Sequence, residues 1–268
     1  MTVAELYRAL DSRIPRSYAC SWDNDGLSCC PDPDAPVTGI LLALDLTENM
    51  PEAAHQRGFN VILTHHPLLF RPLKSVSGGN TGSRKVITMI QNGISAMAFH
   101  TRLDALPGGV NDTLAAALGL ADITPFGDAD GEDGNAAGMP IGRIGSLPDA
   151  ESFDTFCARV RSALRLSAVL AADSGRSIRR VAVLGGSGED DVPAALAAGA
   201  DVFVTGEVKY HQLCDMPYEG MSLIAAGHYH TEFPVLSVLA HMVRDVYAEA
   251  GETAVPMEIV DFCTAQIR

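Results

Sequence analysis

Histidines and carboxylates follow several apolar, strand-like segments of this 268-residue chain. His65 and His66 come directly after FNVILT, and His100 follows ISAMAF with Asp104 four residues later. Two further segments, DVFVTGE and MSLIAAG, lead into the same residue types, namely Glu207, Lys209 and His211 after the first, and His228, His230 and Glu232 after the second. Ligands of open α/β sheets bind outside the carboxyl ends of the strands. We therefore expect these side chains to gather at such an edge.

The residue types indicate a metal centre. Successive side chains of a strand point to opposite faces, but the adjacent pair His65-His66 stands where the strand is expected to end, so both rings could reach neighbouring ions. Imidazole and carboxylate ligands suit zinc, iron or manganese, whereas magnesium prefers oxygen ligands and water. Two or three histidines with Asp and Glu exceed the needs of one tetrahedral structural ion and fit two ions about 3.5–4 Å apart.

Two alternatives concern these histidines and a glycine-rich turn. If the histidines were only core or capping residues, the purified protein would carry no stoichiometric metal. The turn in LGGSGEDDVP could cradle a phosphate on backbone N–H groups. Glu189, Asp190 and Asp191 crowd the same helix start, however, so the same residues also fit a tight turn whose carboxylates cap the helix.

The elements that must position these residues alternate between strand and helix. Strands are expected at 37–46, 59–66 and 94–100, and helices at 47–58, 84–93 and 111–120, with Thr47 and Asn111 as N-caps. The stretch 125–140 is rich in Gly, Asp and Asn and reads as a linker, after which a second alternating series begins. Pro234 places the start of the last long helix near Thr231 or Glu232. The order predicts an α/β fold with mainly parallel sheets.

Composition limits the classes of partner. The formal net charge of −14 would repel phosphate backbones and anionic lipid, so we expect neither nucleic acid nor membrane as a partner. The six cysteines form no Cys-x-x-Cys pair and are expected to be reduced thiols. The first residues, MTVAELYRALDSRIPR, are unlike a signal peptide, and no apolar run approaches a membrane span. We expect a cytoplasmic protein.

The chain resembles the GTP cyclohydrolase 1 type 2 homolog family, also described as NIF-three-like dinuclear metal-centre proteins. The resemblance covers essentially the whole chain and depends on motifs in the family's order. These are Trp22-Asp23-Asn24 with Gly26-Leu27, THHPLLF at 64–70, HTRLDA at 100–105, GGSG at 185–188, DVFVTGEVKYH at 201–211 and GHYHTE at 227–232.

The resemblance implies two divalent metal ions held by His65, His66, Asp104, His228 and Glu232, with Asp104 or Glu232 bridging them. It implies two interlinked α/β domains with the metal site at the strand C-terminal ends between them, expected here at 1–125 plus 222–268 and at 126–221. It also implies a ring-shaped homohexamer. Matching motif positions make His100, Lys209 and His211 candidates for contacts with substrate or for catalysis.

Three departures accompany the resemblance. Arg102 stands where the family usually has Asn, His230 occupies a position that is usually small, and Ser28-Cys29-Cys30 replaces a more typical Gln-Val-Gly. Arg102 and His230 could alter substrate preference or metal occupancy. The function expected is a metal-dependent hydrolase, acting on a nucleotide or another phosphorylated or cyclic-amidine substrate. The alternative is a metal-binding, regulatory or metal-trafficking protein without turnover.

Overall fold

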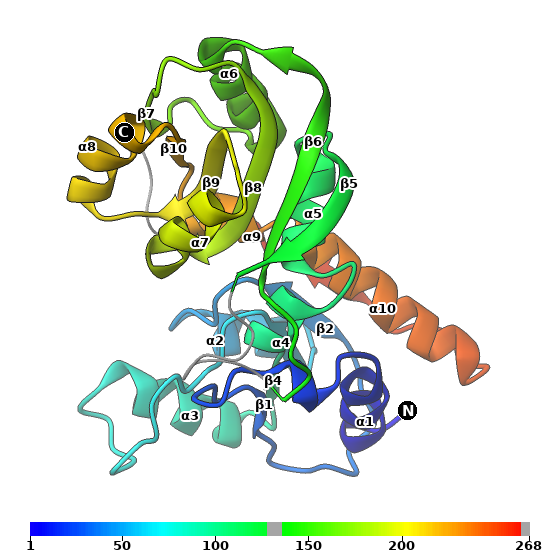
Figure 1. Ribbon diagram of the computed structural model, residues 1–268. Coiled ribbons are helices and arrows are strands. Elements are labelled where there is room, and N and C mark those ends of the chain that lie inside the picture. The colour runs from blue at the N-terminus through cyan, green and yellow to red at the C-terminus, as the bar shows by residue number, and fades with distance from the viewer. Residues whose placement is uncertain (128–135, 264–268) are drawn as a thin grey trace. The chain divides into compact units, whose positions relative to one another are not determined.

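A computed structural model describes residues 1–127 and 136–263, and Figure 1 shows its helices and strands. Contacts between residues divide the chain into two compact units. The first contains Met1–Leu103 and Leu236–Phe262, and the second contains Asp104–Val235. Within the described ranges, no helix combines the length and the hydrophobicity that a membrane span would require.

The first unit is built on a five-stranded sheet of order β1-β4-β3-β2-β11. Its strands are β1 (Gly26–Cys29), β2 (Ile40–Ala43), β3 (Val61–Thr64), β4 (Ser95–Ala98) and β11 (Met257–Ile259). The ladders between β11, β2, β3 and β4 are parallel, and β1 runs antiparallel to β4. Every residue of β2, β3 and β4 is buried, as expected for central parallel strands.

Helices supply the apolar side chains that bury this sheet. They are α1 (Val3–Arg13), the short η1 (Arg16–Tyr18), α2 (Met50–Gln56), α3 (Thr81–Gln91), α4 (Thr101–Ala105) and most of α10 (Val235–Glu249). One core cluster joins Met50, Ala54 and Met89 of α2 and α3 to the strand residues Leu41 and Ile62. The helix α1 begins with a capping box between Thr2 and Glu5.

The second unit is built on a six-stranded sheet of order β5-β6-β8-β9-β10-β7. Its strands are β5 (Ala121–Phe126), β6 (Gly142–Glu151), β7 (Leu170–Ala172), β8 (Ile178–Ser187), β9 (Val202–Glu207) and β10 (Ser222–Ala225). β8, β9 and β10 are parallel, whereas β5/β6, β6/β8 and β10/β7 pair antiparallel. This sheet is therefore mixed, and the expectation of a mainly parallel sheet holds for the first unit.

Helices cover both faces of the second sheet. They are α5 (Val110–Ala117), α6 (Phe153–Leu164), η2 (Glu189–Asp191), α7 (Val192–Ala197), α8 (Tyr210–Glu219) and α9 (His228–Glu232). Leu114 of α5 and Phe156 of α6 pack on Val181 and Val202 at one face. Val192 of α7 and Leu213 of α8 pack on Phe203 at the other. Figure 1 shows α6 and α7 on opposite sides of β8. The predicted α/β class with two sheets is confirmed.

Local expectations differ from the structure at several element ends. The N-cap of α2 is Asn49 rather than Thr47, and the N-cap of α5 is Gly109 rather than Asn111. The expected linker 125–140 begins inside β5, and its residues 128–135 lie outside the described ranges. The domains predicted at 1–125 plus 222–268 and at 126–221 stay a prediction. Contacts assign β5 and β10 to the second unit, because both strands pair within its sheet.

Arg102 is a buried link inside the first unit. Its Nε donates to Asp25 Oδ2 at 2.6 Å, and its Nη1 donates to Asp11 Oδ1 at 2.6 Å and to the carbonyl of Ile14 at 2.8 Å. Its guanidinium carbon lies 4.5 Å from the centroid of the Phe99 ring. The residue predicted to affect substrate or metal thus joins the end of α1 to α4.

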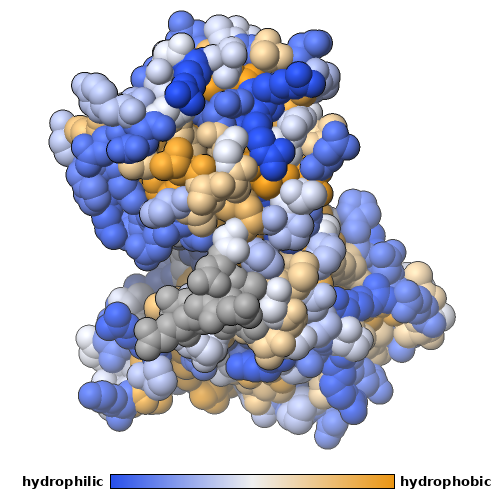
Figure 2. Space-filling model, in the orientation of Figure 1, coloured by the Kyte–Doolittle hydropathy of each residue, from blue (hydrophilic) through white to orange (hydrophobic). Residues whose placement is uncertain are grey.

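The visible surface is largely polar. Figure 2 shows hydrophilic side chains over much of the face that it draws, with smaller apolar areas among them. None of the six cysteines takes part in a disulfide.

Candidate metal centre

The backbone holds His65 and His66 at the carboxyl end of β3. Their amides donate to the carbonyls of Ala43 and Leu44, which continue the pairing with β2. The hydroxyl of Thr64 then donates to the carbonyl of His66 at 2.7 Å, and the chain bends at both histidines. This turn removes the strict alternation of a strand. The two imidazole centroids consequently lie 4.9 Å apart.

His100, which follows β4, completes a group of three rings in the first unit. Its ring centroid lies 5.3 Å from that of His65 and 5.5 Å from that of His66. One nitrogen from each ring can be chosen so that the three atoms lie within 4.8 Å of one another. We call His65, His66 and His100 the histidine trio. Imidazole nitrogens at this spacing are ligands that zinc, iron or manganese accepts.

Each ring of the trio has its Nδ1 next to a protein acceptor. His65 Nδ1 lies 3.0 Å from the carbonyl oxygen of Phe99, and His66 Nδ1 lies 2.8 Å from Asp45 Oδ1. His100 Nδ1 lies 3.0 Å from Asp23 Oδ1. When Nδ1 carries the proton and donates to such an acceptor, Nε2 presents its lone pair. The trio is therefore oriented for ligation through Nε2.

Asp23 fixes His100 and the start of α4 together. Its Oδ2 accepts from the amide of Thr101 at 3.0 Å and from the Thr101 hydroxyl at 2.6 Å. Burial alone would raise the pKa of Asp23, but the hydrogen bond and charge of His100, together with hydrogen bonds from the side chain and backbone of Thr101, lower it to about 2. Asp25 also holds His100 in place, because its Oδ2 accepts a hydrogen bond from the amide of His100 at 3.2 Å.

Asp104 lies in α4, one helical turn after His100, and belongs to the second unit. The buried side chain of Asn111 holds the backbone there. Its Nδ2 donates to the carbonyl of Asp104 at 3.3 Å, and its Oδ1 accepts from the amide of Gly185 at 2.7 Å. Asn111, expected as a helix cap, instead joins α4 to β8. It acts from inside α5 because the helix begins one residue earlier.

His228 and Glu232 form a second group of candidate ligands on α9. His228 Nε2 lies 3.3 Å from Glu232 Oε2, and His228 Nδ1 lies 3.2 Å from Glu207 Oε1 at the end of β9. The two residues are a true i, i+4 pair within α9. Pro234 lies between α9 and α10. The first helix after β10 is therefore α9, which begins before the proline, and the long helix α10 begins after it.

Glycines allow α9 to approach the sheet. A Cβ on Gly186 would lie 2.2 Å from Glu232 Oε1, and a Cβ on Gly206 would lie 2.7 Å from the Cα of His228. Gly186 also has a φ of +73°, which favours glycine. The glycines of GGSG and TGE thus leave room for His228 and Glu232. The turn serves this packing, and η2 with its three carboxylates follows it.

Lys209, His211 and His230 have other surroundings. Lys209 Nζ lies 3.4 Å from Glu189 Oε1 and 3.5 Å from Asp190 Oδ1. His211 is exposed on α8. His230 packs against Tyr229 with ring centroids 5.5 Å apart, and it is outside the candidate metal groups found among the described residues. Catalytic roles for Lys209 and His211 stay predictions.

The comparisons with known proteins agree with these motifs. The profile of the family described as Duf34/NIF3 (NGG1p interacting factor 3) matches residues 1–263. The chain belongs to the Duf34/NIF3 family. A GTP cyclohydrolase 1 type 2 homolog of Clostridium perfringens is 32% identical over 267 residues, which cover 97% of this chain and 98% of that protein.

Solved structures of Duf34/NIF3-like proteins share the fold. A hypothetical protein of Staphylococcus aureus superposes with a TM-score of 0.88 at 29% identity, over 100% of this chain and 99% of the other. A Bacillus cereus protein related to NIF3 superposes with a TM-score of 0.87 at 23% identity, over 100% and 99% of the two chains. The second likeness concerns the fold alone.

A cavity of about 380 Å³ lies beside Asp45, the partner of His66, in the first unit of this Duf34/NIF3 protein. Thr47, Asn49, Met50 and Phe262 are among its lining residues. It opens past the carboxyl end of β2, where an α/β sheet usually binds ligands. A ligand in this cavity would therefore lie close to the residue that orients His66.

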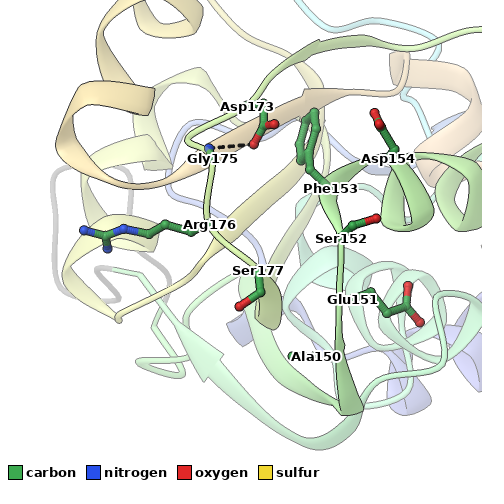
Figure 3. A pocket seen from close by; sticks show the side chains of 9 residues that line it. All are labelled: Ala150, Glu151, Ser152, Phe153, Asp154, Asp173, Gly175, Arg176 and Ser177. Atoms are coloured by element: carbon green, nitrogen blue, oxygen red, sulfur yellow. Dashed lines mark hydrogen bonds between the residues drawn. The ribbon is translucent and has the colours of Figure 1, made fainter.

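A second cavity of about 430 Å³ belongs to the other unit. Figure 3 shows Glu151, Asp154 and Asp173 around it, with the Gly175 amide donating to Asp173 Oδ1 at 2.8 Å. It lies before the amino end of β8, whereas Glu232 lies near Gly186 at the carboxyl end of that strand. The cavity is therefore not part of the His228–Glu232 group.

Two partners of the histidines, Asp23 and Asp45, were not among the predicted site residues. Glu207 was expected at the sheet edge, but its pairing with His228 was not predicted. Asp45 and Glu207 carry the same signal as the histidines, since each is a carboxylate at or just past the end of a buried strand. Asp23 lies in a loop that precedes its strand, so strand-end reasoning could not find it.

Proposed function

We propose that this protein is a metal-dependent hydrolase. It holds two divalent metal ions (zinc, iron or manganese) and acts on a nucleotide or another phosphorylated small molecule. The ligands are His65, His66, Asp104, His228 and Glu232. One observation carries the proposal: the three ligand histidines, His65, His66 and His228, each have Nδ1 at 2.8–3.2 Å from a carbonyl or carboxylate oxygen, which orients Nε2 for a metal.

The donor set fits such ions. Histidine and carboxylate together match the preferences of these metals, and Gly186 leaves the space in which the Glu232 carboxylate lies. Divalent ions bound there would supply an acidified water and polarise the substrate. His100 would exchange a proton with the substrate at Nε2, because Asp23 holds its Nδ1. Asp23 would also stabilise the protonated ring.

The expected partners follow from charge and resemblance. A small anionic substrate can be neutralised by ions, whereas a long polyanion would be repelled by a chain of net charge −14. We propose a homohexamer, as the resemblance to this family implied, and a cytoplasmic location, as expected from the composition.

A second candidate is a metal-binding, regulatory or trafficking protein without turnover. The contacts of Lys209 favour it, because Glu189 and Asp190 neutralise the ammonium group of this candidate for contact with substrate. The two candidates share their metal ligands. They differ in whether the protein converts a substrate once the metal is bound.

Elemental analysis of protein purified without added metal tests the site. His228→Ala should lose both ions, whereas His230→Ala, a matched histidine two residues away on α9, should keep them. A wild-type protein that is folded but free of metal would refute the proposal. Equal metal content in the two variants would exclude His228 as a ligand.

A screen of nucleotides and phosphoesters with the same preparations separates the candidates. An enzyme should show turnover by the wild type and His230→Ala and loss of turnover by His228→Ala. His100→Gln and His211→Ala should then be compared at equal metal content. Turnover that disappears only in His100→Gln would assign proton transfer to His100. Full metal content without any turnover favours the second candidate.

A further inference from the structure

Two exposed aromatic rings stand beside the histidine trio. Trp22 is 45% exposed and Phe70 is 55% exposed. Their ring centroids lie 5.7 Å apart, and the His100 ring lies 6.0 Å from Trp22 and 6.2 Å from Phe70. We call Trp22 and Phe70 the aromatic rim. It continues the group formed by the rings of His65, His66 and His100.

Hydrogen bonds hold the rim in place although its faces are exposed. Asn24 Nδ2 donates to the carbonyl of Leu69 at 2.6 Å, which joins the segment of Trp22 to the segment of Phe70. Asp23, the neighbour of Trp22, is the residue that orients His100. The rim and His100 are therefore positioned by the same short segment, 22–24. Such preorganisation is what a binding site requires.

The chemistry of the rim favours one class of occupant. Indole and phenyl faces bind planar rings by stacking, and this attraction is tolerant because every nucleobase has a π-face. Single exposed aromatics, such as Tyr218 at 94% exposure, are ordinary on protein surfaces. A contacting pair next to three imidazoles differs from these, because a ring bound on it would lie within reach of His100.

We propose that the aromatic rim binds the planar heteroaromatic ring of the substrate by stacking and thereby places its reacting part at the histidine trio. The occupant is a nucleoside-like heterocycle, and Trp22 and Phe70 are its binding residues. This inference rests on the proposed function, since it assigns the substrate ring to the same site. Because stacking is tolerant, the rim itself should distinguish little between purines.

Fluorescence offers a direct test, because Trp22 is the one tryptophan of the sequence. Metal-loaded protein is titrated with guanosine, with adenosine and with ribose 5-phosphate, which has no aromatic ring. Both nucleosides should quench Trp22 emission in a saturable way, and ribose 5-phosphate should not. A response to ribose 5-phosphate equal to that to the nucleosides would overturn the role of the ring.

Variants then test Phe70. Phe70→Ala should weaken nucleoside binding about 10-fold, as expected for the loss of one stacking partner. Phe70→Tyr keeps the ring and should bind as the wild type does. Tyr218→Ala, which removes an exposed aromatic of the second unit, should leave binding unchanged. Equal affinities of Phe70→Ala and wild type would overturn the proposal.

Metal content and molecular mass are measured on the same samples. Wild type without metal would count against the proposed function. Metal-loaded wild type without nucleoside quenching would overturn the aromatic-rim inference alone. If nucleosides have no effect and Phe70→Ala changes the oligomeric state, the rim is a contact between copies, and the inference is also overturned.

Discussion

At the residue scale, a carboxylate that accepts a hydrogen bond from a ligand histidine should increase the affinity for metal. Asp45 lies 2.8 Å from Nδ1 of His66, and this pairing fixes the ring and increases the basicity of its other nitrogen. Asp45→Asn keeps the size of the side chain and removes its charge. The imidazole then loses a strong acceptor without any change in the ligand set.

We expect Asp45→Asn to weaken metal binding about 10- to 100-fold with little change in stability. Competition with a chelator of known affinity measures the loss. Asp149→Asn, an exposed carboxylate of the second unit, serves as the control. Wild-type affinity in Asp45→Asn would mean that His66 does not need this partner, or that it is not a ligand.

Asp191 gives a pH-dependent prediction. Burial, with a smaller contribution from Asp190, raises the pKa of Asp191 to about 6. The folded protein therefore binds this proton more tightly than the unfolded chain, where an aspartate titrates near ~3.9. The stabilisation of the folded protein by the protonated Asp191 carboxyl is fully present below about pH 4. It is lost as the pH rises through about 6.

Asp191→Asn should accordingly raise the free energy of unfolding by about 1–2 kcal/mol at about pH 8, a value reduced for partial exposure of the group. At about pH 4 the variant and the wild type should be equally stable. Urea unfolding at the two pH values measures the difference. An equal increase in the free energy of unfolding at both pH values would contradict the raised pKa of Asp191.

At the scale of elements, the glycines of the second unit decide how closely α9 approaches the sheet. Gly186 and Gly175 have nearly the same φ, +73° and +75°. A Cβ on Gly186 would meet Glu232, whereas a Cβ on Gly175 has open space around it. The two positions therefore separate the cost of backbone conformation from the cost of steric overlap.

Both Gly175→Ala and Gly186→Ala should lose about 1–2 kcal/mol of stability because of the positive φ. Gly186→Ala should in addition displace Glu232 and weaken metal binding by at least about 10-fold, the effect of ~1.4 kcal/mol. Chelator competition and urea unfolding measure the two effects. If Gly186→Ala binds metal as tightly as Gly175→Ala does, the carboxylate of Glu232 is not a ligand.

Most strands and helices could be predicted because periodicity and turn residues are local signals. The buried runs of β2, β3, β4, β8 and β9 were visible in the sequence. β1, β7 and α8 were not expected, since GLSC and LAA are short and weakly patterned, and Pro217 interrupts the pattern of α8. The cap expected at Asn111 failed because its side chain has partners far along the chain.

The histidines of the site could be predicted for the same reason, as their strands were visible. The partner of His100 could not, because its pairing with Asp23 spans 77 positions and depends on where the loop before β1 lies. Arg102 shows the opposite kind of error, in which the sequence suggested a role that its contacts do not support. Its position in a metal-site motif suggested a functional role, whereas its contacts join α4 to Asp11 of α1 and to Asp25 in the loop before β1.

At the scale of the whole molecule, ring orientation and metal loading are separable. The acceptors of His65, His66, His100 and His228 are protein groups, so the fold alone sets the ring positions. A zinc finger behaves differently, because its binding free energy is its folding free energy. The large cores of both units supply the stability here.

Chelation should therefore remove the metal and leave the protein folded. We expect an unchanged far-ultraviolet circular dichroism spectrum and a lower melting temperature, because a ligand that binds only the folded state adds stability by mass action. Re-addition of the metal should restore the original melting temperature. Unfolding on chelation would show that the cores cannot hold the chain together without the ions.

The edge of the first sheet limits how copies of the chain can associate. The pairing of β1 with β4 shifts between Leu27 and Cys29, so that Ser28 is an extra residue in this edge strand. Such a bulge bends the strand and disturbs the row of amides and carbonyls that an incoming strand would need. Growth of a continuous intermolecular sheet through β1 is thereby discouraged, so a strand from a neighbouring copy would have to add at another edge of the two sheets.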